Sequence, residues 1–195
     1  MALRESTIQR KTQETDISLS LNLDGTRQIS LDIPVPFFPH LVKSLAFFAG
    51  WDLAIKARGD LEVDCHHTVE DLGIVLGMGF RKALEKGGNV LRFGSSLIPM
   101  DEALSQAVID LSGRSYFIYK PVALTERVGN FEVSLIEEFL RAMCMNAHIT
   151  LHVIMLWGNN SHHCLESLFK AIGQALGNAS QPAGGTHVLS TKGTL

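Results

Sequence analysis

The sequence predicts an α+β fold made of two similar halves. The first observation is a repeated motif of two adjacent histidines followed three residues later by a glutamate, at 66–70 (HHTVE) and 162–166 (HHCLE). The copies are separated by 162 − 66 = 96 residues at the histidines and 166 − 70 = 96 residues at the glutamates, in a chain of 195 residues. The second observation is that hydrophobic periodicity predicts strands before helices, in the same order, on both sides of the midpoint. An internal duplication accounts for both observations.

In the first half, alternating apolar and polar residues predict a strand that turns at Asp24-Gly25 and continues into a hairpin partner. Three prolines between residues 34 and 39 end this region, and the next segment has helical spacing and a terminal glycine. Gly73, Gly77 and Gly79 are expected to allow close packing of the last helix, because no GxGxxG or GK[ST] pattern marks a nucleotide loop. The expected elements are strands at 16–23 and 28–33, a helix at 41–50, strands at 51–57 and 61–63, and a helix at 68–86.

The second half repeats this order. Ser161 is the expected N-cap of the helix that carries the second motif. His40 lies at the start of the first helix of the first half, and Glu138 lies near the start of the corresponding helix of the second half, so each half offers a third metal ligand. The expected elements are paired strands at 103–111 and 116–119, a helix at 133–146, a strand at 149–157, and a helix at 161–176.

Composition restricts the function and the cell compartment. With 46% hydrophobic residues, 19% charged residues and a net charge of −3, the chain is expected to fold and lacks the basic field that nucleic-acid binding needs. Cys65, Cys144 and Cys164 have no disulfide-framework spacing, which indicates a reducing compartment. Residues 1–16 have no apolar core for a signal peptide, and the most apolar run, 41–55, is shorter than a membrane span. We therefore expect a cytoplasmic protein with no nucleic-acid or membrane partner.

The repeated motif has the chemistry of a metal site. On a helix, residues i and i+4 share a face while neighbours point about 100° apart, so the first histidine and the glutamate can bind one ion and the second histidine faces elsewhere. Imidazole and carboxylate together suit Mn²⁺, Fe²⁺, Co²⁺ or Zn²⁺. A single His-His pair is more often a hydrogen-bonded polar face, but duplication at identical spacing favours ligands to two ions.

The chain contains several unusual stretches: 11–15 (KTQET), 59–61 (GDL), 64–73 (DCHHTVEDLG), 92–94 (RFG), 99–103 (PMDEA), 110–114 (DLSGR), 162–170 (HHCLESLFK) and 190–193 (STKG). Together they give the chain a resemblance to imidazoleglycerol-phosphate dehydratase of L-histidine biosynthesis, over nearly its whole length. The resemblance implies that each half is a four-stranded sheet backed by two helices, with halves at 1–92 and 93–178 and a tail, 179–195, that closes the active site within one compact unit. It also implies a 24-subunit homo-oligomer whose sites lie between subunits and hold two Mn²⁺ ions each.

The resemblance also implies roles for individual residues. One ion takes His66 with a neighbour's His162 and Glu166, and a family histidine position beside it is Glu138 here, which adds negative charge. Proton transfer is assigned to Glu166 first and to Glu14, a substrate-contacting position, second. The second ion is expected to bind four residues, one of them from a neighbouring subunit. Four further residues are expected to bind the substrate phosphate. These sets are His40, His67, Glu70 and the neighbouring His163 for the ion, and Arg92, Arg114, Ser190 and Lys192 for the phosphate.

The implied reaction is the dehydration of D-erythro-1-(imidazol-4-yl)glycerol 3-phosphate to 3-(imidazol-4-yl)-2-oxopropyl phosphate. Two other functions fit the histidines: a di-metal hydrolase that uses a metal-activated water, and a non-catalytic metal-storage shell. A third alternative is a family member with impaired activity, because Glu138, Pro39 and Ser44 depart from the family pattern. Turnover of phosphate esters would indicate the hydrolase, and metal uptake without turnover would indicate the shell.

Overall fold

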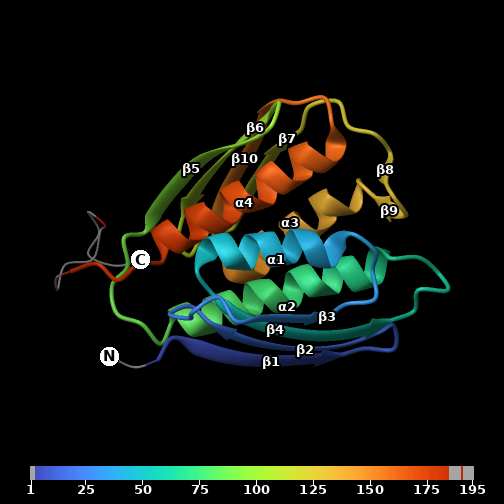
Figure 1. The fold of residues 1–195 in the computed structure, drawn as a ribbon. Coiled ribbons are helices and arrows are strands. Elements are labelled where there is room, and N and C mark those ends of the chain that lie inside the picture. Colours follow the sequence, from blue (N-terminus) through green and yellow to red (C-terminus); the bar gives the residue numbers. More distant parts are fainter. Residues whose placement is uncertain (1–2, 185–189, 191–195) are drawn as a thin grey trace.

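Two four-stranded sheets enclose four long helices in the computed structural model, which describes residues 3–184 and 190 (Figure 1). The first sheet has the strand order β1-β2-β4-β3 and is backed by α1 and α2, and the second has the order β5-β6-β10-β7 and is backed by α3 and α4. The predicted α+β class with two similar halves is confirmed. The elements are β1 Glu5–Lys11, β2 Thr15–Asn22, β3 Ile29–Asp32, α1 Phe38–Ala49, β4 Asp52–Gly59, α2 His66–Leu84, β5 Phe93–Met100, β6 Ala103–Asp110, β7 Tyr116–Lys120, β8 Arg127–Val128, β9 Phe131–Glu132, α3 Leu135–Ala147, β10 Thr150–Trp157 and α4 Ser161–Ala179.

The strand pairing corrects two expectations. The strand expected at 28–33 was assigned to a hairpin with 16–23, but β3 pairs in parallel with β4. The strand expected at 116–119 was assigned to 103–111, but β7 pairs in parallel with β10. Each hairpin assignment is wrong because a helix, α1 or α3, follows the strand and returns the chain in the same direction, as parallel pairing requires. β4 and β10 thereby occupy the second interior position of their sheets, next to β2 and β6.

Periodicity missed the edge strands β1 and β5. In β1 the inward positions include Ser6 and Ile8, and in β5 they include Gly94 and Ser96, so neither strand has a run of large apolar side chains. The short strand expected at 61–63 is wrong, because these residues form a turn between β4 and α2. The apolar residues within 61–63, which suggested a strand, lie in a loop that leads to the first motif.

Both histidine motifs lie in the first turn of a helix and begin in the same way. The Asp64 carboxylate accepts a hydrogen bond from the backbone N–H of His66 at 2.7 Å, and the Asn160 side chain accepts one from the backbone N–H of His162 at 2.9 Å. The expected N-cap at Ser161 is wrong, since Asn160 has this position. The Ser161 hydroxyl instead accepts a hydrogen bond from a loop backbone N–H.

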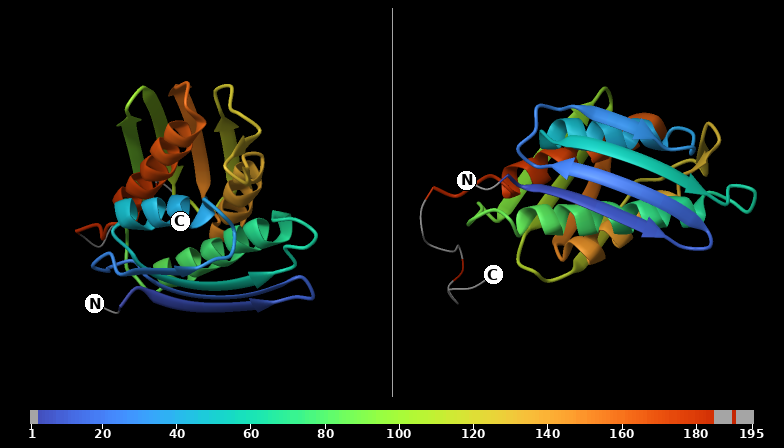
Figure 2. Two further views of the ribbon diagram at one scale, coloured as in Figure 1. Left: turned by 45° about the vertical axis from the view of Figure 1, so that its right-hand side comes forward. Right: turned by 90° about the horizontal axis from the view of Figure 1, so that it is seen from below.

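The helices of one half pack on the helices of the other, α2 on α3 and α1 on α4 (Figure 2). A Cβ atom on Gly73 or Gly77 would lie 2.4 Å from a backbone carbonyl oxygen of α3, and one on Gly173 would lie 2.2 Å from the Leu45 carbonyl of α1. The expected close-packing role of Gly73 and Gly77 is therefore confirmed. None of the described helices is long and apolar enough to cross a bilayer.

The outward faces of the two sheets differ. On the first sheet the exposed positions are mostly polar or charged, as Lys56 and Arg58 on β4 illustrate. On the second sheet Phe93 and Leu97 are 59% and 53% exposed, and neighbouring strands add further exposed apolar side chains. Register places these residues on one face of the sheet, and they include Val108, Tyr116 and Trp157.

Candidate metal centre

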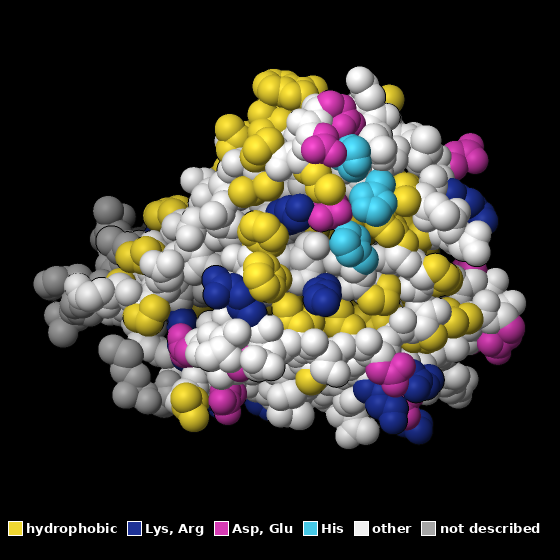
Figure 3. Space-filling view, viewed as in Figure 1, with side chains coloured by type: hydrophobic (Ala, Val, Ile, Leu, Met, Phe, Trp, Pro, Cys, Tyr) yellow, Lys and Arg dark blue, Asp and Glu magenta, His cyan; other side chains and the backbone are white. Residues whose placement is uncertain are grey.

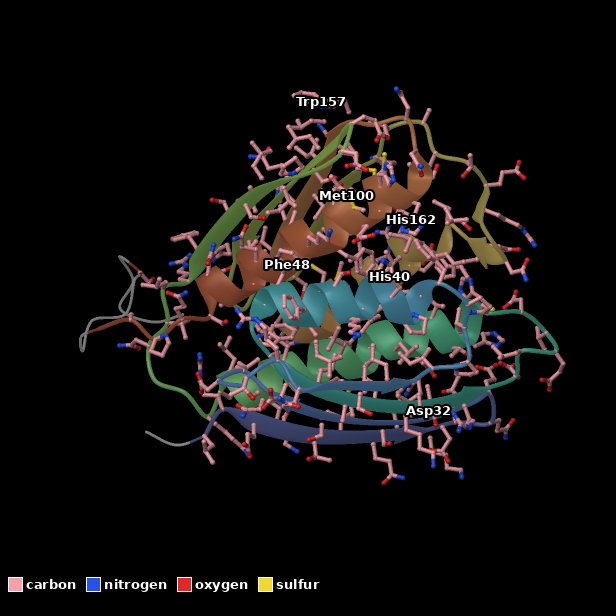
Figure 4. The ribbon with its side chains drawn as sticks, viewed as in Figure 1. Asp32, His40, Phe48, Met100, Trp157 and His162 are labelled. Atoms are coloured by element: carbon pink, nitrogen blue, oxygen red, sulfur yellow. The ribbon has the colours of Figure 1, made fainter. Side chains whose placement is uncertain are left out.

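Two histidines and a glutamate converge where the first turns of α1 and α4 meet. His40 Nε2 lies 2.9 Å from Glu166 Oε2, and His162 Nε2 lies 3.2 Å from the same oxygen. The three donor atoms lie within 4.8 Å of one another, and the imidazoles of His40 and His162 approach each other from the two helices (Figure 4). Imidazole nitrogen with carboxylate oxygen is a donor set for a divalent transition ion, and no thiolate takes part.

The glutamate of this group is ionised and partly shielded from water. Burial of Glu166 favours its neutral form, but hydrogen bonds from Lys170 and His40 outweigh this effect and lower the pKa of its carboxyl to about 2. Lys170 Nζ lies 2.8 Å from Glu166 Oε1. Sequence reasoning gave Lys170 no role, although its position one helical turn after Glu166 was a usable signal. Histidine, acidic and basic side chains gather on this face of the molecule (Figure 3).

The first motif presents fewer converging donors. His66 Nε2 lies 3.7 Å from Glu70 Oε2, one turn later on α2, and both side chains are nearly half exposed. Among the described residues, no group of three donors includes either of them. His66 and Glu70 thus form an open pair on the surface of one chain.

The second histidine of each motif is held by a carboxylate from outside its helix. His67 Nδ1 lies 3.0 Å from Asp60 Oδ2, and this hydrogen bond raises the pKa of His67. His163 Nδ1 lies 2.8 Å from Glu102 Oε2, which raises the pKa of His163 and lowers that of Glu102 to about 2. Sequence reasoning missed both carboxylates, because their distances along the chain from the histidines, 7 and 61 residues, follow no helical or strand period.

A second charged cluster gathers two arginines around one carboxylate. Arg92 donates from Nε to Asp110 Oδ1 at 2.7 Å and from Nη2 to Asp110 Oδ2 at 3.3 Å. Arg114 Nη2 lies 3.7 Å from Asp110 Oδ2, and the Arg114 side chain is 68% exposed. The two arginines assigned to phosphate are therefore neighbours, although 22 residues separate them along the chain (114 − 92 = 22).

Comparison with known proteins identifies the family. The model of the imidazoleglycerol-phosphate dehydratase family matches residues 33–176. The imidazoleglycerol-phosphate dehydratase of Acetivibrio thermocellus is 48% identical over 193 residues, which cover 98% of this chain and 99% of that protein. The chain belongs to the imidazoleglycerol-phosphate dehydratase family. It is accordingly a hydro-lyase of histidine biosynthesis, as the resemblance implied.

The similarity to relatives and to solved structures extends over at least 92% of this chain. The imidazoleglycerol-phosphate dehydratase of Desulforudis audaxviator is 46% identical over 195 residues, the whole of both chains. The crystal structure of the Staphylococcus aureus N315 enzyme superposes with a TM-score of 0.84 at 35% identity and covers 92% of this chain and 99% of its own. A structure from Pyrococcus furiosus in complex with (S)-C348 has the same TM-score at 34% identity, over 96% of this chain and 100% of its own. The two-sheet fold is therefore that of the imidazoleglycerol-phosphate dehydratases.

The remaining predicted residues of this dehydratase lie in several places. Glu138 is partly buried in the first turn of α3 and lines a surface cavity of about 580 Å³ with Tyr119 and Glu126. Glu14 lies in the β1–β2 turn, with Oε1 3.8 Å from His67 Nε2. Ser190 is partly buried, whereas Lys192 lies outside the described residues, as does most of the predicted closing tail 179–195.

The grouping of donors differs from the assignment that the resemblance implied. The structure places His40 with His162 and Glu166 in one chain, whereas the assignment placed His40 with His67 and Glu70 at the other ion. Both expected sets contain residues from a neighbouring subunit, so contacts within one chain do not decide them. The division of ligands between the two ions stays a prediction.

Proposed function

We propose that this dehydratase converts D-erythro-1-(imidazol-4-yl)glycerol 3-phosphate to 3-(imidazol-4-yl)-2-oxopropyl phosphate and water, with two Mn²⁺ ions in each active site. The reaction removes a proton from carbon and a hydroxyl group from the adjacent carbon. A bound divalent ion supplies Lewis acidity toward the imidazole ring and the leaving hydroxyl. The observation that carries the proposal is the pair of His-His-x-x-Glu motifs at equivalent helix starts, in a chain of this family.

The donor chemistry fits manganese. The group of His40, His162 and Glu166 combines two imidazoles with an ionised carboxylate. None of its three donors is a thiolate or an amine. The Lys170 ammonium holds one carboxylate oxygen of Glu166 and leaves the other facing the imidazoles. Such a set suits Mn²⁺, Fe²⁺, Co²⁺ or Zn²⁺ better than Ca²⁺, which prefers oxygen ligands alone.

We further propose that the sites are shared between subunits of a 24-subunit assembly. Among the described residues, His66 and Glu70 supply only two donors, which leaves room for donors from a second copy. The exposed apolar face of the second sheet, which includes Phe93 and Leu97, supports burial against another copy. Among the described residues the three cysteines are free, which supports the cytoplasmic location that we propose.

Glu166 and Glu14 are the residues that we propose for proton transfer. The pKa of Glu166, at about 2, makes its carboxylate a weak base and favours its role as a ligand. Glu14 is half exposed and lies beside His67, where it can contact a substrate and move a proton. We therefore rank Glu14 above Glu166 as the general base, in reverse of the order that the sequence favoured.

We assign the substrate phosphate to Arg92, Arg114, Ser190 and Lys192. Two adjacent guanidiniums match the geometry and charge of a phosphate dianion, and Asp110 offsets only one of the two positive charges. The positive charge that remains would attract the phosphate dianion. This cluster supports a phosphorylated substrate and has no role in a metal-storage shell.

The test is turnover by protein stripped of metal, before and after addition of Mn²⁺, with the ketone product followed directly. Activity restored by Mn²⁺ is the expected result, with Glu138 as a tolerated departure from the family histidine. Hydrolysis of simple phosphate esters without ketone formation would support the di-metal hydrolase instead. Tight Mn²⁺ binding with no turnover would support the storage shell or an impaired enzyme.

A further inference from the structure

The two carboxylates that face His67 and His163 come from different parts of the fold. Asp60 follows β4 and reaches the first turn of α2, whereas Glu102 lies in the β5–β6 turn and reaches the first turn of α4. The duplication therefore did not copy one residue into both halves. Two unrelated positions arrive at the same contact, a carboxylate oxygen about 3 Å from Nδ1 of the second histidine of the motif.

Each carboxylate is fixed by its surroundings. Glu102 accepts hydrogen bonds from the backbone N–H groups of Asn159 at 3.2 Å and Asn160 at 2.8 Å, which join the β5–β6 turn to the start of α4. The backbone N–H of Asp60 donates to the Glu14 carbonyl at 3.1 Å, and the Asp60 side chain is only 18% exposed. Neither carboxylate is a freely rotating surface group.

The contact determines which ring nitrogen carries the proton. An ionised carboxylate only accepts hydrogen bonds, so Nδ1 of each histidine must be the donor. In a neutral imidazole the lone pair then lies on Nε2. Nε2 does not donate a hydrogen bond to a second carboxylate, because the Glu14 oxygen near His67 and the Asp101 oxygen near His163 are 3.8 Å and 3.7 Å away, which is too far.

We propose that Asp60 and Glu102 are positioning residues. Each carboxylate accepts a hydrogen bond from Nδ1–H of the second histidine of a motif, so that Nε2 of this histidine is available to the metal ion. This inference rests on the metal centre proposed above. The first histidines differ, because His66 and His162 direct Nε2 toward the glutamate one turn later. Each motif thus has one imidazole oriented by its own helix and one oriented by a loop carboxylate. Such outer carboxylates fix the ring orientation and make the ligand nitrogen more basic.

The experiment measures Mn²⁺ binding, independently of activity, in the full chain and its Asp60→Asn and Glu102→Gln variants. Free Mn²⁺ is quantified by electron paramagnetic resonance during titration of metal-stripped protein. Both variants are expected to bind Mn²⁺ roughly 10- to 100-fold more weakly. The matched control is Glu62→Gln, which removes an exposed carboxylate from the same loop as Asp60 and is expected to bind normally.

A second measurement separates positioning from a general structural role. The thermal midpoints of the metal-stripped variants are expected to match that of Glu62→Gln, since the loops stay in place without the charge. Affinities within twofold of the control for both variants would overturn the inference while leaving the metal centre intact. If Asp60→Asn does not fold, Glu102→Gln tests the same contact in the other half. Absence of Mn²⁺ binding by the unaltered protein would overturn the metal centre and this inference together.

Discussion

Arg92 donates to Asp110 through two nitrogens, at 2.7 and 3.3 Å, on a carboxylate that also lies 3.7 Å from Arg114. This pairing orients the Arg92 guanidinium at the edge of the second sheet and leaves the mostly exposed Arg114 next to it. The arrangement keeps a net positive charge at this place before any phosphate arrives, because one carboxylate faces two guanidiniums.

Replacement of Arg114 by alanine should therefore raise the KM for the phosphorylated substrate by roughly 10- to 100-fold, since a charged hydrogen bond contributes about 1.5–3 kcal/mol. Inhibition by inorganic phosphate should weaken in proportion. The control is Arg127→Ala, which removes an exposed arginine that pairs with Glu132. Equal KM values for the two variants would contradict the assignment of Arg114 to phosphate.

His40→Ala should lower the affinity for Mn²⁺ by at least about tenfold, because the loss of a ligand costs no less than the loss of an outer partner. Titration calorimetry of metal-stripped protein measures this. His148→Ala is the control, since His148 caps α3 and contacts Arg81 away from the donor group. Normal binding by His40→Ala would exclude His40 from the metal centre.

Lys170→Met should destabilise the metal-stripped protein by about 1–3 kcal/mol at neutral pH, because the buried Glu166 carboxylate loses a charged hydrogen bond. The pKa of Glu166 is lowered from 4.5 to about 2, so its stabilising contribution is complete above pH 4.5 and disappears as the pH falls toward 2. The difference between the variant and the unaltered protein should shrink across that range. Urea unfolding at several pH values, with Lys120→Met as an exposed control, measures it. A difference that is constant with pH would show that Lys170 does not act through Glu166.

Gly77→Ala should lower the free energy of unfolding by about 1–3 kcal/mol, even though alanine favours helices. The added Cβ would lie 2.4 Å from the Met143 carbonyl oxygen and would separate α2 from α3. Gly88→Ala, where an added Cβ meets nothing within 4 Å, is the matched control. Chemical denaturation of both variants compares them directly, and equal stabilities would contradict close packing at Gly77.

Leu97→Asp should reduce the size of the assembly measured by light scattering, because it places a charge on the apolar outward face of the second sheet. The same substitution at Ala54, on the outward face of the first sheet, should leave the size unchanged. An assembly that tolerates Leu97→Asp would exclude this face from the contacts between copies.

The sequence predicted the helices and the interior strands well, because their apolar side chains recur at a clear period. Gly50 ends α1 in the left-handed conformation, as expected of a terminal glycine. The edge strand β5 was not predicted, because the side chains at its inward positions are small or polar, as at Gly94 and Ser96. The strands that pair with β3 and β7 were not predicted either, since hydrophobic periodicity identifies a strand but not the strand beside it.

In the candidate site, too, the sequence predicted the local contacts but not those between residues far apart along the chain. The i, i+4 spacing within 162–166 correctly indicated that the side chains of His162 and Glu166 lie together, because a helix fixes that distance. The approach of His40 to this pair spans 126 residues and depends on the packing of α1 on α4. The same holds for the contact of Glu102 with His163, which no local pattern encodes.

The glycine-mediated packing of α1 on α4 and of α2 on α3 has a consequence for the origin of the chain. The helices of each half are covered by those of the other, so a single half would leave an apolar helical surface in water. Two separate copies of one half would bury that surface only by associating through a twofold, self-complementary interface. The present chain has the architecture of such a homodimer fused end to end. The covalent connection between α2 and β5 makes the association of the two halves independent of protein concentration.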